Sequence, residues 1–225
     1  MGKKVLSFHL IVLGIQGSGK GTQSELLSKH FKMPYVGVGE LIRKKIEEKT
    51  PLSNKIRTFY DTGQLLPDEV VKEIVKEELE KIPKDQSILF EGYPRSLKQL
   101  KDLEDILNTR KIQKKMAIVL DIKEETVYKR LEGRRVCSVC GKIYYPPESL
   151  KLQNCKECGG RLIQRADDNP AAIKERIKTY KKVTNPMLLY LKSKGELIQI
   201  NGEQRIEEVF SDIINKIKLV EREKN

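Results

Sequence analysis

The feature that most constrains the fold is a glycine-rich turn between an apolar run and a helix-like run. Residues 14–20 match the pattern G-x-x-x-x-G-K, with the apolar run at 5–13 and the helix-like run at 22–31. The glycines let the backbone turn with its N–H groups pointing inward, and a helix N-terminus at such a turn binds anionic phosphate. Lys20 adds a point charge, and Thr22 supplies a hydroxyl one residue later than usual, because Gly21 follows the lysine. The alternative, a chance glycine-rich turn, is disfavoured by the strand and helix context.

Beyond this phosphate-binding loop (P-loop), short apolar runs alternate with amphipathic stretches. Extended segments are predicted at 34–36, 87–91, 116–122 and 196–200. Helices are predicted at 40–49, 52–60, 67–79, 97–107, 124–131, 169–194 (with a bend possible at Pro186) and 206–217. Strands that alternate with helices indicate an α/β fold, a three-layer parallel sheet with helices on both faces. Ligands bind beyond the strand C-termini in such sheets, where Gly14, Glu91 and Asp121 are expected. We interpret His9, within the first strand, as a packed residue without a catalytic role.

A short insert with four cysteines interrupts this alternation. Residues 135–164 contain no long periodic run, and Cys137-x-x-Cys140 is separated from Cys155-x-x-Cys158 by 14 residues. A glycine follows each pair and permits the backbone to wrap around a metal-bound sulfur. Four thiolates form a closed tetrahedral shell typical of structural zinc, and about thirty residues cannot bury much core without a metal. Iron in the same shell, disulfides and a redox role are the alternatives.

The charge of the chain raises the question of a nucleic-acid partner. Charged residues make up 34% of the sequence and the net charge is +12. The lysines are spread over many predicted helices, mixed with glutamates, and there is no tryptophan. We therefore expect solvated helix surface and a cleft for polyphosphates rather than a nucleic-acid interface.

The N-terminal segment resembles the start of a signal peptide, because two lysines precede an apolar run. No small-residue cleavage site follows, and the same run is needed as the strand before the P-loop. No stretch approaches the ~20 apolar residues of a membrane span. We expect a cytoplasmic protein with no membrane partner.

Motifs spread from about Val5 to Ile217 resemble the adenylate kinases, in their long-lid, zinc-bearing form. The P-loop at 14–23 matches the family's version, including the glycine after the lysine. Residues 91–95, Glu-Gly-Tyr-Pro-Arg, resemble the family's Asp-Gly-Phe-Pro-Arg signature. Arg134 and Arg135 match the arginines leading into the lid, and residues 165–168 match the segment leading out of it, with Arg176 on the next helix.

This resemblance implies a kinase that moves the terminal phosphoryl group of ATP to AMP reversibly, giving two ADP, with Mg²⁺ bound to ATP and Zn²⁺ in the lid. It implies one P-loop nucleoside monophosphate kinase core over residues 1–225, with a monophosphate-binding flap at 39–69 and a zinc-binding lid at 135–168, acting as a monomer. Phosphoryl transfer needs positioning and charge neutralisation, and an anionic acceptor needs no general base.

The resemblance also implies roles for individual residues. The catalytic group is Lys20, Arg134, Arg165 and Arg176. The ATP-binding group is Gly17, Ser18, Gly19, Lys20, Gly21, Thr22, Arg130 and Gln204. The AMP-binding group is Val38, Arg43, Gly92, Arg95 and Gln99. Glu91 is expected in the magnesium shell through water, and the metal ligands are Cys137, Cys140, Cys155 and Cys158.

Three positions depart from the family pattern. Glu91 replaces Asp, Tyr93 replaces Phe, and Val38 stands where adenylate kinases usually carry Thr. Because the last position touches base recognition, a UMP/CMP kinase or a broader nucleoside monophosphate kinase is the alternative function. A more distant alternative is a zinc-bearing nucleic-acid-binding protein that uses its P-loop as a switch.

Overall fold

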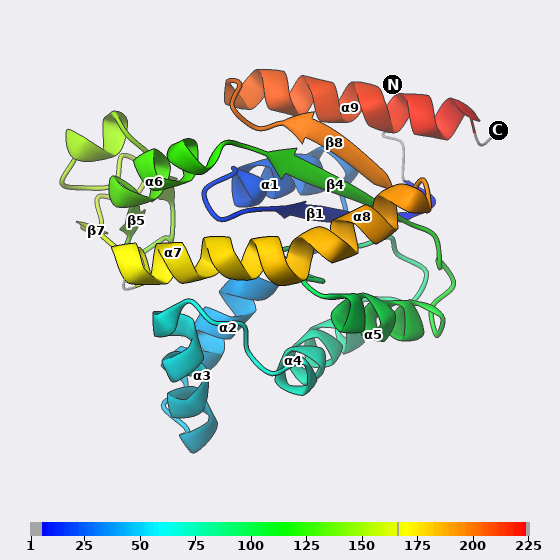
Figure 1. Cartoon of the computed structure of the whole chain (residues 1–225), viewed down its shortest axis with the longest axis horizontal. Helices are drawn as coiled ribbons and strands as arrows, with labels where there is room; N and C mark the ends of the chain where they lie inside the picture. The colour runs from blue at the N-terminus through cyan, green and yellow to red at the C-terminus, as the bar shows by residue number, and fades with distance from the viewer. Residues whose placement is uncertain (1–5, 166, 224–225) are drawn as a thin grey trace.

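The computed structural model describes residues 6–165 and 167–223. Its main body is a parallel sheet in the strand order β2-β3-β1-β4-β8, covered by helices on both faces (Figure 1). The strands are β1 (His9–Gly14), β2 (Tyr35–Gly37), β3 (Leu89–Glu91), β4 (Lys115–Asp121) and β8 (Leu197–Asn201). All neighbouring pairs are parallel, which confirms the predicted three-layer α/β fold. The first strand begins at His9 rather than at Val5, which lies outside the described residues.

The helices follow the predicted stretches and differ from them mainly at their ends. They are α1 (Lys20–Phe31), α2 (Val38–Glu47), α3 (Pro51–Thr62), α4 (Asp68–Glu80), α5 (Leu97–Leu107), α6 (Glu124–Glu132), α7 (Pro170–Thr179), α8 (Asn185–Ser193) and α9 (Ile206–Glu223). Side-chain caps define several starts: Thr50 and Ser53 form a capping box at α3, and Ser96 caps α5. α2 begins at Val38 instead of the predicted Glu40, because it follows β2 without a loop.

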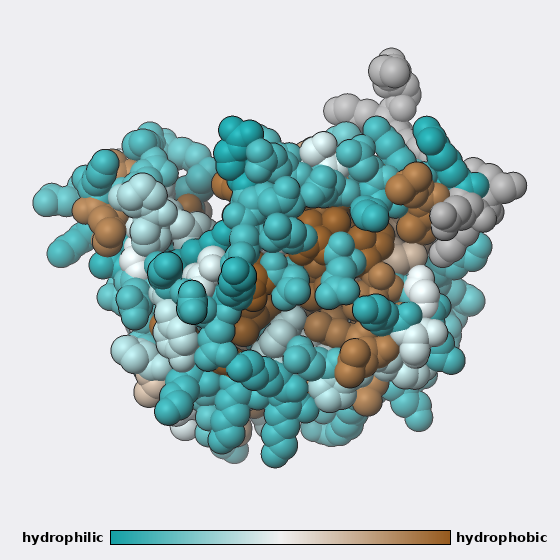
Figure 2. All heavy atoms as spheres, turned by 45° about the horizontal axis from the view of Figure 1, so that its top comes forward, coloured by the Kyte–Doolittle hydropathy of each residue, from teal (hydrophilic) through white to brown (hydrophobic). Residues whose placement is uncertain are grey.

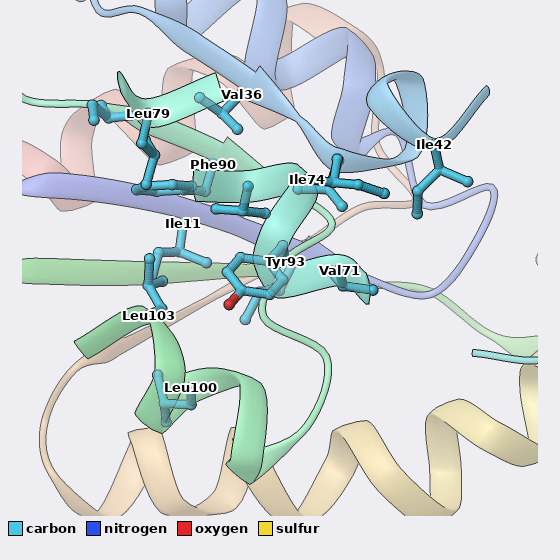
Figure 3. Close-up of a cluster of buried hydrophobic side chains, with 14 of the residues drawn as sticks. Ile11, Val36, Ile42, Val71, Ile74, Leu79, Phe90, Tyr93, Leu100 and Leu103 are labelled. Atoms are coloured by element: carbon cyan, nitrogen blue, oxygen red, sulfur yellow. The ribbon is translucent and has the colours of Figure 1, made fainter. Parts of the chain in front are cut away.

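Alternation along the central strands produces two apolar cores. In β1, Ile11 and Leu13 belong to the core under α2, α4, α5 and α8, while Leu10 and Val12 face the core under α1 and α9. Figure 3 shows the first core, where Phe90 and Tyr93 lie among side chains of α4 and α5. Two buried faces explain why the strands read as continuous apolar runs.

One π-helical turn divides the long helix predicted at 169–194. Residues Tyr180–Thr184 form this turn between α7 and α8, where the Asn185 N–H reaches the Tyr180 carbonyl five residues back. Pro186 has no N–H for an α-helical bond to the preceding turn, so a local widening is tolerated there. The break therefore precedes the predicted bend at Pro186.

The cysteine-rich insert contains a small antiparallel sheet that periodicity did not predict. Its strands are β5 (Arg135–Cys137), β6 (Ile143–Tyr144) and β7 (Leu162–Ile163), in the order β6-β5-β7. These strands have two or three residues each, too short for a periodic pattern. Their own core is small, with Tyr144 and Leu162 beside two of the cysteines.

The face drawn in Figure 2 is mostly hydrophilic, as the many lysines and glutamates led us to expect, and its largest apolar area lies near the centre. Within the described residues, no helix is both long enough and apolar enough to span a membrane.

His9 is packed as predicted. It is fully buried, its Nε2 lies 2.8 Å from the Ile112 carbonyl oxygen, and its Nδ1 accepts the Ile88 N–H at 3.0 Å. Burial lowers the pKa of the imidazole, so the folded state keeps it neutral.

We predict that the free energy of unfolding falls as pH is lowered from 7.5 to 5.5. The unfolded chain binds a proton on His9 near pH 6.5 and the folded chain does not, which contributes a slope of up to about 1.4 kcal/mol per pH unit. Urea denaturation across this range should show a shallower slope for His9→Gln, whatever its absolute stability. His30→Gln, at an exposed histidine, is the control, and equal slopes for all three proteins would contradict the prediction.

Candidate active site and metal centre

A cavity of about 550 Å³ lies at the carboxyl ends of β1 and β3. Its wall combines the P-loop, the flap segment from α2 to the residues before α4, the lid and α7. Gly14 and Glu91 line it, as expected for the ends of their strands. Asp121 does not line it, and instead lines a second hollow of about 370 Å³ between α8 and the sheet.

The P-loop adopts backbone conformations that require glycine. Gly14 has φ +147°, and a Cβ there would lie 2.5 Å from Ser18 Oγ and 2.7 Å from the Leu120 carbonyl oxygen. Gly19 has φ +97° and precedes the first residue of α1, Lys20. The loop therefore turns directly into a helix N-terminus that faces the cavity, the arrangement that binds phosphate.

Lys20 points into this cavity. Its Nζ lies 3.2 Å from the Ile15 carbonyl oxygen and 3.9 Å from a Glu91 carboxylate oxygen. Burial lowers the pKa of Lys20 to about 8; Glu91 opposes this shift, and Arg95, Arg134 and Arg176 add to it. The lysine is therefore surrounded by more positive than negative charge.

Five arginines share the cavity wall with Lys20: Arg43, Arg95, Arg134, Arg165 and Arg176. Burial lowers the pKa of Arg165, and repulsion from Arg134 and Arg43 lowers it further. Burial likewise lowers the pKa of Arg95, despite the attraction of Glu91. Buried cations that repel one another are costly, and an anionic ligand would relieve that cost.

Two aspartates at the end of the lid hold two of these arginines. Arg134 donates from Nε and Nη2 to the Asp168 carboxylate, at 2.7 and 2.5 Å. Arg176 donates to Asp167 at 2.5 Å and to Gln16 Oε1 at 2.6 Å. Although burial opposes it, Arg176 holds the pKa of Asp167 below its usual value. These pairs fix the direction of each guanidinium, and they connect the end of the lid to the segment after α6 and to α7.

The flap side of the cavity contains the residues expected at the acceptor. Arg43 donates to the Tyr60 hydroxyl at 3.4 Å, and Arg95 Nε donates to the Gly92 carbonyl at 2.7 Å. Val38, only 2% exposed, lines the wall, as does Gln99. The structure thus brings all five residues of the predicted AMP group to one cavity.

The predicted ATP group is only partly assembled at the cavity. Gly17, Gly19, Lys20 and Gly21 line it, whereas Ser18, Thr22, Arg130 and Gln204 do not. Arg130 donates to the Gly17 and Gly202 carbonyls at 3.1 and 3.0 Å, beside the P-loop. Gln204 donates to Asp212 at 2.9 Å. Ser18 Oγ is buried and has no hydrogen-bond partner among the described residues.

Sequence reasoning missed Tyr60 and the partner roles of Gln16, Asp167 and Asp168. The Tyr60 ring lies 5.5 Å from the Arg176 guanidinium, and its carbonyl accepts from Arg176 at 3.2 Å. Tyr60 is far from Arg176 in the sequence, so a helical pattern gives no signal for this contact. For the aspartates, their position after Arg165 was the available signal, but it does not indicate which arginine each one pairs with.

The four cysteines of the insert form a cluster that could hold a metal ion. Their Sγ atoms all lie within 4.8 Å of one another, with 3.4 Å between Cys137 and Cys158 and 3.5 Å between Cys140 and Cys155. None of the four is in a disulfide. Backbone N–H groups of Val139 and Cys140 point at the Cys137 sulfur.

The surroundings of this cluster suit a bound ion. The glycines after each cysteine pair, Gly141 and Gly159, both have φ +73°, as the predicted tight turns require. Gly160 lies so close that a Cβ would be 2.8 Å from the Cys137 sulfur. The Tyr144 hydroxyl lies 3.3 Å from Cys155 Sγ and accepts the Lys156 N–H. The two loops thus enclose Cys137 and Cys155, which are buried, while Cys140 and Cys158 stay exposed.

Comparison with known proteins decides the family. Residues 12–196 match the family described as adenylate kinase. A Clostridium botulinum protein named adenylate kinase is 40% identical over 92% of this chain and 97% of its own length. The chain belongs to the adenylate kinase family. Adenylate kinases of Clostridium tetani and Bacillus subtilis are 37% and 36% identical, over 92% and 91% of this chain and 97% and 95% of their own lengths. Family membership confirms the resemblance of the motifs, including the cysteine-bearing long lid.

We predict one metal ion per chain, measured by elemental analysis of the purified protein. Cys155→Ser should lower the melting temperature by several degrees and change activity at moderate temperature far less, because a structural ion would stabilise the fold of the insert and take no part in the transfer itself. Ser138→Ala, at an exposed serine between the first two ligands, should melt like the unmodified protein. A metal-free protein with an unchanged melting temperature would contradict the prediction.

Proposed function

We propose that this chain transfers the terminal phosphoryl group of ATP to AMP, reversibly, to give two ADP. The observation that carries the proposal is the convergence of Lys20 and five arginines on one cavity that the P-loop, the flap and the lid all line. Membership of the adenylate kinase family supports it. The reaction serves purine nucleotide and energy homeostasis, and we expect it in the cytoplasm, by a monomer.

The residues of the cavity suffice for this transfer without a general base. The P-loop N–H groups and Lys20 would hold the donor phosphates, and Arg43 and Arg95 would hold the acceptor monophosphate. Arg134, Arg165 and Arg176 would neutralise the charge that spreads over the transferred group. The acceptor oxygen is already anionic, so attack needs alignment rather than proton removal. The aspartate pairs of Arg134 and Arg176 support the alignment, because they fix two of these guanidiniums before substrate arrives.

Glu91 fits the expected place of Mg²⁺ bound to ATP. Its carboxylate lies at the end of β3, lines the cavity and is 3.9 Å from Lys20 Nζ. Magnesium keeps several waters and takes few protein ligands, so the longer Glu side chain could contact those waters where the family usually has Asp. The ion would supply positive charge that helps to neutralise the phosphates. The chain's own part is to place one acidic group beside the lysine.

The lid at 135–168 and the flap at 39–69 are proposed as covers over the two substrates. The wall of the cavity includes Arg43 from the flap and Lys142 from the lid. Closing both would exclude water, which would otherwise accept the phosphoryl group. We propose Zn²⁺ as the lid metal, because four thiolates are the donor set of closed structural zinc sites. An ideal tetrahedron with Zn–S bonds of ~2.3 Å has S–S edges of about 3.8 Å, near the shortest separations seen here.

One observation favours a broader acceptor range. Val38 lies in the cavity wall, where a Thr would offer the base a hydroxyl. A hydrogen bond of this kind contributes ~0.5–1.5 kcal/mol net. The second candidate function is therefore a nucleoside monophosphate kinase that prefers AMP by a narrower margin.

We predict that Lys20→Ala lowers kcat at least about 100-fold, because one preorganised charge that acts on the transferring group contributes that much. A coupled assay with ATP and AMP measures it. Lys174→Ala removes the same charge from the exposed side of α7 and should retain full activity. Retention of more than about a tenth of kcat by Lys20→Ala, in a folded variant, would overturn the assignment.

We predict that Val38→Thr raises kcat/KM for AMP a few-fold relative to UMP and CMP, since it adds a hydroxyl at nearly constant shape. The assay compares AMP, UMP, CMP and GMP. Val38→Ala, which changes volume without adding a hydroxyl, is the control and should not sharpen selectivity. If UMP or CMP is the better acceptor of the unmodified protein, the broader kinase is the right function.

A further inference from the structure

The side-chain amide of Gln99 is held at both of its ends. Gln99 is 2% exposed, and its Nε2 donates to Asp68 Oδ1 at 2.8 Å. Its Oε1 accepts the backbone N–H of Arg95, also at 2.8 Å. The Ser96 cap and the Tyr93 hydroxyl bond to the Gln99 backbone, so the start of α5 is fixed as well.

These two partners permit only one orientation of the amide. A carboxylate only accepts and a backbone N–H only donates. A rotation of the amide by 180° would place Oε1 against the Asp68 carboxylate and Nε2 against the Arg95 N–H. Both hydrogen bonds would be lost, and like groups would face each other in a buried place.

The fixed amide presents a definite pattern to the cavity. Gln99 lines the wall, whereas Asp68, at the first position of α4, does not. After its two internal contacts, the amide has one N–H and one lone pair left. Adenine offers the matching acceptor and donor, at N1 and the 6-amino group. A 6-oxo purine such as hypoxanthine offers the reverse, a donor at N1 and an acceptor at O6, and would pair only with the rotated amide.

We propose that Asp68 is a positioning residue that determines acceptor specificity, by holding Gln99 in the orientation that accepts a 6-amino purine monophosphate and rejects a 6-oxo purine monophosphate. This inference rests on the proposed function. It adds a residue that sets base selectivity through Gln99 without itself lining the cavity. Asp68 also lies near the end of the flap segment at 39–69. Its contact with Gln99 therefore couples base selection to the point where the flap joins α4.

The alternative role of Asp68 is to stabilise the N-terminus of α4 with its charge. Glu69 is the next residue in the same helical turn, is exposed and pairs with Lys98. Glu69→Gln therefore removes the same charge from the same turn without touching Gln99. It is the matched control.

The test is the ratio of kcat/KM for IMP to kcat/KM for AMP, in a coupled assay with ATP. Asp68→Asn keeps the shape but offers a donor as well as an acceptor, so the rotated amide loses only one contact. The ratio should rise about tenfold, the effect of roughly one hydrogen bond, mainly through a lower KM for IMP. Glu69→Gln should leave the ratio unchanged. Asp68→Ala removes the acceptor, so the rotated amide again loses only the Arg95 contact, and the ratio should rise by a similar factor.

An unchanged ratio in folded Asp68→Asn and Asp68→Ala, with wild-type protein active on AMP, would overturn this inference and leave the proposed function intact. A ratio that rises equally in Glu69→Gln would assign the effect to helix charge instead, and would also overturn it. Failure of the wild-type protein to phosphorylate AMP would overturn both.

Discussion

The structure depends on one electrostatic constraint, the gathering of Lys20 and five arginines in a buried cavity with too little negative charge to balance them. Every layer of the fold supplies part of this cluster. β1 and α1 place the lysine, β3 and the turn after it place Arg95, and the segments on either side of the lid place Arg134 and Arg165. Asp167 and Asp168 each hold one arginine, which keeps the group in place without neutralising it. Such a site favours the binding of a polyphosphate, because the negative charge of the ligand would relieve the repulsion between the buried cations.

Much of this arrangement could be predicted because its signals are local. A few neighbouring residues indicate the backbone geometry in three places: the P-loop glycines, the apolar strands, and the cysteine pairs with their glycines. The rest arises from contacts distant in the sequence. Tyr60 reaches Arg176, Asp68 reaches Gln99, and neither contact leaves a periodic pattern. The lid strands are too short to show alternation, and the start of β1 was placed too early because Leu6 and Phe8 are buried without being in a strand. The roles of Arg130, which contacts the P-loop, and of Gln204 stay predictions, because neither residue lines the cavity wall.

In the proposed function, the two sides of the cavity recognise different parts of the substrates. The P-loop side would bind phosphates through backbone N–H groups and positive charge, and every nucleoside triphosphate carries such phosphates. The flap side would add shape and hydrogen-bond direction at Val38 and Gln99, which distinguish bases. On this proposal, selectivity resides in a few neutral or internally paired groups, while the cationic groups supply affinity and rate. The cysteine cluster adjoins the same cavity, since Cys140 lines its wall, but four thiolates that hold an ion would take no part in binding substrate.

The π-helical turn between α7 and α8 determines which side chains of α8 face the same way as those of α7. A turn closed by a bond to the fifth preceding residue contains one residue more than an α-helical turn, so it rotates everything after it by about 100°. With that rotation, Arg176 and Thr179 face the cavity while Met187 and Leu191 are buried against the sheet. One extra residue thus allows α7 to contribute to the polar cavity wall while α8, which continues it, packs into the apolar core. Chain length in this segment is as strictly constrained as residue type, although no single side chain there reveals it.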